Sequence, residues 1–286
     1  MSATPDGERK PFVDQAMRTR TRTALLLAPI GIASIIFLPP LWFGLLIGTL
    51  FGIGLWEWSR LSGWESTWHR AVLVLVQVGM MVWLALDGEA ALKQAMLVGV
   101  AFWLFAPFWL KYYDFARLPK RRYLALKTMA GALAVIPAFA ATLYLDGYSV
   151  NGPYWVLFLF MLIWVADSGA YFSGKRFGRE KLAPHISPGK TREGAYGAFV
   201  ACAIYAGITA LVMQMPWKQA LLFVLLAAVT VAFSIIGDLF ESLIKRHSQV
   251  KDSGDIFPGH GGVFDRFDSL FAAAPVFVFG KTLLSL

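Results

Sequence analysis

The stretch QALLFVLLAAVTVAFSIIGDLF, residues 219–240, decides the fold. From residue 220 to residue 237 it carries no charged side chain, and only Thr230 and Ser234 are polar. An α-helix rises about 1.5 Å per residue, so about 20 apolar residues cross the roughly 30 Å hydrocarbon layer of a bilayer. A run of this length and composition is typical of a transmembrane helix.

Similar apolar runs recur along the whole chain. The composition is 57% hydrophobic and 15% charged, whereas soluble domains carry about 25% charged residues. Backbone groups in lipid must pair within their own segment, and these runs are too long and uniform for barrel strands. We therefore expect an all-α, polytopic integral membrane bundle of about nine transmembrane helices. The runs lie near residues 23–38, 41–58, 71–86, 92–110, 128–145, 153–168, 194–214, 219–240 and 269–286. We interpret the first as a retained helix, because its polar lead-in is long for a signal peptide.

The net charge of +8 has a topological explanation. If the spans alternate, the basic segments all fall on one side, and the loops 87–91 and 146–152 on the other side contain no Lys or Arg. The positive-inside rule then places the N-terminus and the basic segments in the cytoplasm. Because the charge is accounted for in this way, no nucleic acid partner is expected. The basic segments are 9–22, 111–127, 175–192 and 245–266.

The chain is interpreted as one membrane domain with two functional regions. Residues 1–150 form apolar helices with short loops, and residues 151–286 form a catalytic transmembrane region with two dense polar segments. The most notable acid of the first region is Glu57 in WEWSRLSGW. We expect it to form an ion pair with Arg60 at a helix end, flanked by tryptophan anchors at the membrane interface.

The first polar segment begins inside an apolar run. Asp167 follows fourteen nearly pure hydrocarbon residues, and an acid placed at the membrane centre costs about 2.5–3.5 kcal/mol, so it is a functional candidate. The downstream GKT at 189–191 is not predicted to be a P-loop, because Pro184 stands where a glycine is needed and no strand is expected before it. The basic and hydroxyl side chains there can still bind phosphate.

The second polar segment spans the end of one apolar run and the start of the next. Asp238, Glu241, Ser242 and Lys245 follow i, i+3, i+4, i+7 spacing, which puts them on one helix face. A glycine-rich loop at 259–262 follows, and then Asp265 and Asp268 stand three residues apart. Carboxylates beside many basic groups, without a Cys or His cluster, indicate Mg²⁺ and an anionic substrate. His260 fits an acid–base or phosphate-binding role and a purely structural role equally well.

The segment from Ser242 to Asp268 closely resembles one known signature. It reads Ser-x-Ile-Lys-Arg, then Lys-Asp-x-Gly at 251–254, Pro-x-His-Gly-Gly at 258–262 and Asp-Arg-x-Asp at 265–268. This resembles the CDP-diacylglycerol synthase (phosphatidate cytidylyltransferase) family, with every fixed position of the signature met over 27 residues. Residues 165–194 resemble the family's upstream segment, and WEWSRLSG resembles the N-terminal half of bacterial members. Where the family usually has Ser-Pro-Lys-Lys-Thr, this chain has Gly189 at the first lysine.

The resemblance implies an enzyme of the bacterial inner membrane that converts CTP and phosphatidate to CDP-diacylglycerol and pyrophosphate with Mg²⁺. A second cation and a homodimer are left open. Metal-binding roles are implied for Asp238, Asp265 and Asp268. The expected catalytic residues are Asp238, Lys251, Asp252, His260, Asp265 and Arg266. The expected substrate-binding residues are Asp167, Lys175, Ser187, Lys190, Thr191, Ser242, Lys245, Arg246, Gly259, Gly261 and Gly262.

Two other classes of membrane protein share some of these features. A CDP-alcohol phosphotransferase also uses membrane carboxylates, but its motif ends in aspartates four apart, whereas Asp265 and Asp268 are three apart. A cation-coupled transporter would place acids near the middle of several helices and often shows repeat symmetry. The acids of this chain collect at the predicted cytoplasmic helix ends, which favours the cytidylyltransferase.

Overall fold

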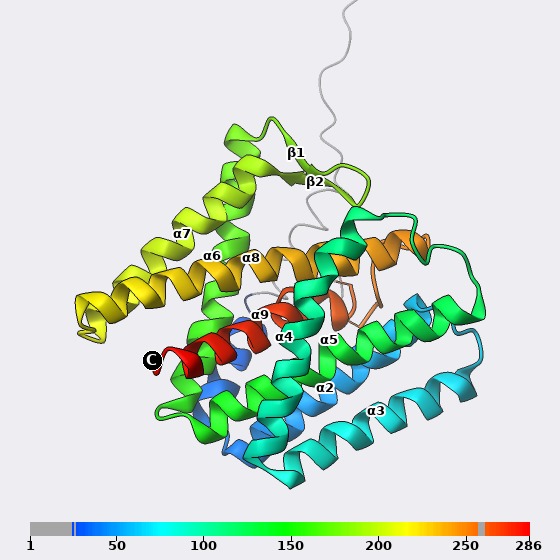
Figure 1. Ribbon diagram of the computed structural model, residues 1–286, viewed down its shortest axis with the longest axis horizontal. Coiled ribbons are helices and arrows are strands. Elements are labelled where there is room, and N and C mark those ends of the chain that lie inside the picture. The colour runs from blue at the N-terminus through cyan, green and yellow to red at the C-terminus, as the bar shows by residue number, and fades with distance from the viewer. Residues whose placement is uncertain (1–24, 26, 257–260) are drawn as a thin grey trace, which may run out of the picture.

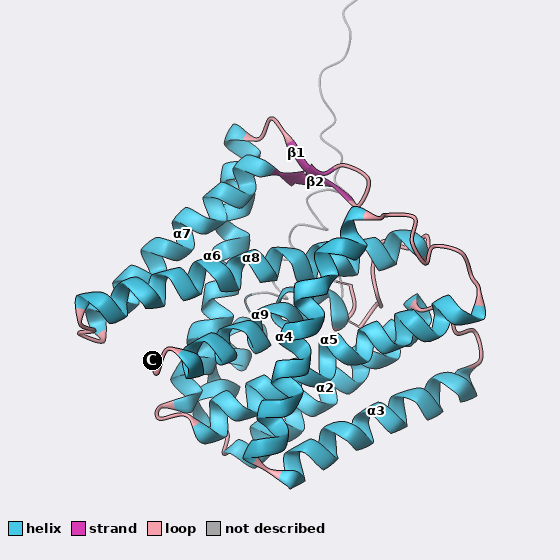
Figure 2. Ribbon diagram, in the orientation of Figure 1, coloured by secondary structure: helices cyan, strands magenta, loops and turns pink. Residues whose placement is uncertain are grey.

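A computed structural model describes residue 25, residues 27–256 and residues 261–286, and nearly all of this part of the chain is helical (Figures 1 and 2). The helices are Leu27–Phe37, α2 (Pro40–Leu61), α3 (Thr67–Asp87), α4 (Glu89–Lys111), α5 (Arg121–Tyr148), α6 (Gly152–Phe177), α7 (Arg192–Val212), α8 (Trp217–His247) and α9 (Phe264–Leu283). Seven of them, α2 to α8, are long and apolar enough to cross a membrane. The prediction of an all-α polytopic membrane bundle is confirmed.

Helix α9 occupies the interior of the bundle. It packs against α2, α4, α5, α6 and α8 (Figure 1), and its residues Ser269–Val278 are all buried. Because protein rather than lipid surrounds this helix, it tolerates the charged residues Asp265, Arg266 and Asp268 in its first two turns. The helix thereby carries part of the signature segment into the bundle.

Two helices extend well past the apolar runs that predicted them. Helix α8 has 31 residues, which corresponds to about 46 Å and exceeds the hydrocarbon thickness by several turns. Helix α6 continues from the apolar run through Asp167 to Phe177. The polar residues near the ends of both runs are therefore held on rigid helices.

A short β-hairpin joins α6 to α7 (Figure 2). It consists of β1 (Lys181–Ala183) and β2 (Ser187–Thr191), which pair antiparallel. The prediction that no strand precedes the GKT sequence is wrong, because β1 does. The sequence is still not a P-loop, since Gly189–Thr191 are part of an extended strand. Thr191 then ends the strand and caps α7, its hydroxyl accepting a hydrogen bond from the Gly194 N–H at 3.1 Å.

The connections between helices gather at two ends of the bundle. The α2–α3 and α4–α5 connections lie on the right of Figure 1, whereas the α7–α8 turn and the C-terminus lie on the left. The hairpin and the described parts of the α8–α9 loop lie toward the end that carries the basic segments. This arrangement agrees with the alternation of spans expected from the sequence.

Candidate functional site

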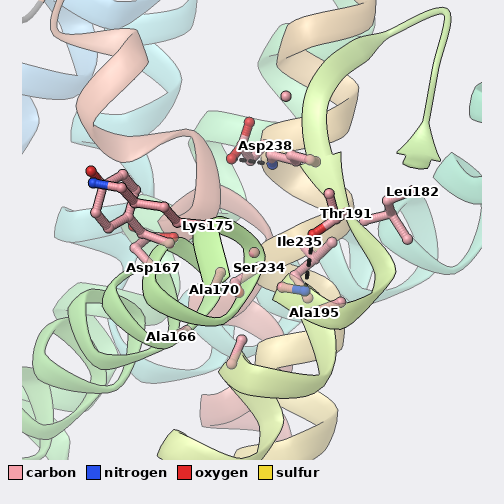
Figure 3. A pocket seen from close by; sticks show the side chains of 16 residues that line it. Ala166, Asp167, Ala170, Lys175, Leu182, Thr191, Ala195, Ser234, Ile235 and Asp238 are labelled. Atoms are coloured by element: carbon pink, nitrogen blue, oxygen red, sulfur yellow. Dashed lines mark hydrogen bonds and ion pairs between the residues drawn. The ribbon is translucent and has the colours of Figure 1, made fainter. Parts of the chain in front are cut away.

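A groove of about 400 Å³ lies between α6, α7, α8 and β2 (Figure 3). Its inner wall is apolar and made of small side chains, among them Ala166, Ala170 and Ala198. Its outer part is polar. We call this outer, charged part the mouth of the groove. Because the groove joins a hydrocarbon-like surface to a charged mouth, it suits an amphiphilic molecule. The polar lining residues are Asp167, Tyr171, Lys175, Lys190, Thr191, Ser234 and Asp238.

Helix α6 contributes one face to this groove. Asp167, Ala170, Tyr171 and Gly174 are spaced i, i+3, i+4, i+7, so they point the same way. Packing explains why position 174 is glycine, since a Cβ there would lie 3.0 Å from the Thr191 hydroxyl. Figure 3 shows Asp167 and Lys175 on the α6 side of the groove, opposite Asp238.

The hairpin places a cation opposite α8. Lys190 on β2 forms an ion pair with Asp238 on α8, and both side chains are about three-quarters buried. Ser242, one turn further along α8, donates a hydrogen bond of 3.4 Å to Asp238. Arg246 donates to the Ile186 carbonyl oxygen at 3.2 Å and so fastens the hairpin to α8. Lys190, Ser242 and Arg246 were expected to bind substrate and Asp238 to bind metal, and the structure brings these four residues to one side of α8.

A second charged cluster lies where α8 meets the start of α9. The Lys245 ammonium donates to Glu241 at 3.0 Å and to Asp265 at 2.7 Å. All three side chains are largely buried, with exposures of 14% for Lys245, 1% for Glu241 and 5% for Asp265. Buried charges are stable only when paired in this way.

Asp265 is held in place by main-chain donors. Its Oδ2 atom accepts hydrogen bonds from the Ser253 and Gly262 N–H groups, both at 2.8 Å, and from the Ser253 hydroxyl at 3.0 Å. Gly261 has a φ of +80°, which favours glycine, and a Cβ there would lie 2.6 Å from the same oxygen. The glycines of the signature thus let the chain close around this carboxylate.

Asp268 connects the two clusters. A Cβ added to Gly237 would lie 2.6 Å from the Asp268 carbonyl oxygen, so Asp268 lies beside the turn of α8 that carries Asp238. Its side chain is close to Glu241, one turn further along α8. The joined clusters therefore hold five carboxylates and four basic groups, so one carboxylate has no counterpart among these basic groups. The carboxylates are Asp167, Asp238, Glu241, Asp265 and Asp268, and the basic groups are Lys175, Lys190, Lys245 and Arg266.

Some predicted site residues lie outside these contacts. Lys251 and Asp252 are exposed on the α8–α9 loop. Ser187 lies in β2, where it pairs with Ala183. Thr191 does line the groove, but its hydroxyl caps α7. Gly259 and His260 lie outside the described residues.

The expectation for Glu57 is wrong. Instead of pairing with Arg60 at an exposed interface, the Glu57 side chain is buried, with 5% exposure, and accepts hydrogen bonds from the α8–α9 segment. Arg60 donates to the Ser253 carbonyl oxygen at 2.7 Å. The signal was present in the sequence: Glu57, like Asp167, is an acid within a predicted membrane run, and such acids are functional candidates.

The carboxylate oxygens of these clusters are of the kind that hard cations such as Mg²⁺ prefer. Within the part of the chain that the structure describes, no three Asp, Glu, His or Cys side chains already converge on one point. However, the Glu241 Oε1 atom, beside Asp268, is buried and has no hydrogen-bond partner among residues 27–256 and 261–286. An orphaned carboxylate oxygen within a cluster of excess negative charge favours a hard cation.

The site therefore belongs to a helical membrane protein with a charged groove at one end of its bundle. Comparison with known proteins defines the class further. The model of the cytidylyltransferase family matches residues 18–283, and the chain belongs to this family of nucleotidyltransferases.

Among curated relatives, the chain is 40% identical over 263 residues to the phosphatidate cytidylyltransferase of Pseudomonas aeruginosa, covering 91% of this chain and 95% of the relative. It is 34% identical over 284 residues to the enzyme of the same name from Haemophilus influenzae, covering 91% and 97%. A match to the Bacillus subtilis enzyme of that name reaches 45% identity over 141 residues, 49% of this chain and 51% of the relative.

Proposed function

We propose that the protein transfers the cytidylyl group of CTP to phosphatidate, giving CDP-diacylglycerol and pyrophosphate. The observation that carries this proposal is the groove, whose apolar inner wall and charged mouth are formed by α6, α7, α8 and the hairpin. A phosphatidate molecule has the same division, with acyl chains and an anionic phosphate. Family membership and the relatives' names support the same reaction.

The residues at the mouth have distinct tasks in this reaction. Lys175 and Lys190 lie where the lipid phosphate would enter, and their charge would offset the repulsion between two polyanions. An oxygen of that phosphate attacks the α-phosphorus of CTP, and the bond from this phosphorus to the bridging oxygen breaks, releasing pyrophosphate. Because the attacking phosphate is already ionised, the residues act by positioning and by charge stabilisation.

The proposed cofactor is Mg²⁺, which Asp238, Asp265 and Asp268 would hold. When bound, it would neutralise charge on the transferred phosphoryl group and on the leaving pyrophosphate. The Ser253 and Gly262 N–H groups keep the Asp265 carboxylate oriented. The Lys190–Asp238 pair would open or shift as the polyanionic substrates enter, because Lys190 can then pair with phosphate.

The proposed location is the bacterial inner membrane, with the groove mouth and the N-terminus facing the cytoplasm. The basic segments at that end of the bundle support this orientation through the positive-inside rule. CTP is a soluble nucleotide, so the proposed orientation also exposes the charged mouth to the compartment that supplies it.

The test uses the purified full-length protein in lipid nanodiscs with phosphatidate, labelled CTP and Mg²⁺. We expect CDP-diacylglycerol and pyrophosphate in equal amounts, and exchange of labelled pyrophosphate into CTP that depends on phosphatidate. A CDP-alcohol phosphotransferase would instead consume CDP-diacylglycerol and an alcohol and release CMP. A transporter would give neither product nor exchange, and either result would overturn the proposal.

A further inference from the structure

Glu57 of α2 makes three hydrogen bonds to the segment that precedes and begins α9. Its Oε1 atom accepts from the Val263 N–H at 3.0 Å, and its Oε2 atom accepts from the Phe264 N–H at 2.8 Å and the Ser253 hydroxyl at 2.7 Å. It is separated from these partners by about 200 residues of chain, and it is nearly completely buried. A carboxylate so placed supplies the N-terminus of α9 with the cap that its own sequence lacks.

The Ser253 hydroxyl links Glu57 to Asp265. It contacts the Glu57 carboxylate at 2.7 Å and the Asp265 carboxylate at 3.0 Å, while the Ser253 N–H also donates to Asp265. Arg60, one turn after Glu57, donates to the Ser253 carbonyl oxygen. Helix α2 thus holds both the hydroxyl and the carbonyl oxygen of Ser253, the residue that supports Asp265.

Two glycines of the signature face Glu57. A Cβ added to Gly254 or to Gly262 would collide with the Glu57 carboxylate. Neither glycine has a positive φ, so backbone conformation does not require glycine there. The close approach of Glu57 explains why these positions are glycine.

We infer that Glu57 is a positioning residue for cytidylyl transfer, which acts by holding Ser253 and the start of α9 so that Asp265 points at the reacting groups. This inference rests on the proposed function. Asp265 is fixed through main-chain and hydroxyl donors, and Glu57 is the group that holds those donors. The N-terminal region therefore contributes a residue to the catalytic region, although it contains none of the groove's lining residues.

The test is a double-mutant cycle of Glu57→Gln with Asp265→Asn, measured as kcat and KM for CTP. Glutamine keeps the shape but turns one acceptor into a donor that faces main-chain N–H groups. We expect kcat to fall by about 10- to 100-fold, the range typical of residues that orient a ligating carboxylate, with a smaller change in KM. Because Glu57 acts through Asp265, the double variant should match Asp265→Asn alone within about threefold.

A matched control is Glu65→Gln, because Glu65 is exposed on the connection that follows α2; it should keep kcat within about twofold, as surface substitutions usually do. Near wild-type kcat in Glu57→Gln, or losses that multiply in the double variant, would overturn the inference.

If Glu57→Gln does not purify as a folded protein, Ser253→Ala takes its place. Its kcat should fall in the wild-type background and not in the Asp265→Asn background, and any other pattern overturns the inference.

Hydrogen exchange separates this inference from the proposed function. The Ser253 and Gly262 amides bond to Asp265 and not to Glu57. Faster exchange of these two amides in Glu57→Gln supports the positioning role even if the wild-type protein makes no CDP-diacylglycerol. Unchanged exchange there counts against the role whatever the reaction is.

Discussion

The Lys190 ammonium meets the Asp238 carboxylate across the groove, so that β2 and α8 are joined at the point where lipid and nucleotide phosphates would converge. Both residues line the groove. The pair keeps two partly buried charges neutralised until substrates arrive, since an unpaired charge at this depth would be costly.

Asp238→Asn should lower kcat by about 100-fold or more, because the lost charge acts on the phosphoryl groups in the transition state. Asparagine keeps the size, so the variant should insert and purify normally. The measurement is the rate of CDP-diacylglycerol formation in nanodiscs, with Glu65→Gln as the control. Full activity at ordinary Mg²⁺ concentrations would contradict the assignment of Asp238 to the metal.

Removing divalent cations should abolish the reaction. The excess of carboxylates around Asp268 implies that EDTA leaves the site with unbalanced negative charge, so we also expect a lower unfolding temperature, read by a thermal shift assay. Mg²⁺ should restore both activity and stability in the wild type, and restore the stability poorly in Asp238→Asn. Activity that persists in EDTA would rule out a dissociable Mg²⁺ cofactor.

Gly189→Lys, which restores the residue usual in the family, should be tolerated. Gly189 is exposed, and a Cβ there meets nothing within 4 Å. An added lysine beside Lys190 increases the positive charge at the mouth, so KM for CTP should change by a few-fold and kcat less. A hundredfold rise in kcat would mean instead that Gly189 impairs the native enzyme.

Hydrophobic length alone predicted most of the helices, because a span of the bilayer requires about 20 apolar residues whatever the sequence. It did not predict that α9 is central, since the apolar runs of buried and lipid-facing helices look alike. The ends predicted for α6 and α8 were also too early, because the apolar runs end where charged residues begin. Those charged turns stay helical because other helices and the hairpin pack on them.

The candidate site was predicted best where residues lie close together in sequence. The helical spacing of Asp238, Glu241, Ser242 and Lys245 predicted that they lie near one another on α8, and all four take part in the two adjoining charged clusters. By contrast, the contacts of Glu57 with Ser253 and Phe264 join segments about 200 residues apart. Nothing in the local pattern around Glu57 identifies such partners, so a local ion pair with Arg60 looked adequate.

Gly262→Ala should destabilise the protein, because its Cβ would collide with the Glu57 carboxylate and the Ser253 hydroxyl. We expect a loss of about 1–3 kcal/mol of stability, as for other overpacked sites. The matched control is Gly207→Ala in α7, where a Cβ meets nothing within 4 Å and where alanine favours the helix. Equal unfolding temperatures for the two variants would show that the close contact at Gly262 is unimportant.

Cysteine labelling tests the proposed orientation of the bundle. The background is Cys202→Ala, since Cys202 is buried in the core, where its thiol donates a hydrogen bond of 3.3 Å to the Leu162 carbonyl oxygen, and the smaller alanine fits the same space. A cysteine at Ser187, on the hairpin, should react with a membrane-impermeant maleimide in inverted vesicles and not in intact cells, because the basic segments stay in the cytoplasm. Tyr148 is exposed at the C-terminal end of α5, on the other side of the proposed membrane. A cysteine there should react in intact cells and not in inverted vesicles. Labelling of the Ser187→Cys variant in intact cells would place the groove mouth outside, away from CTP, and would refute both the orientation and the reaction proposed for this site.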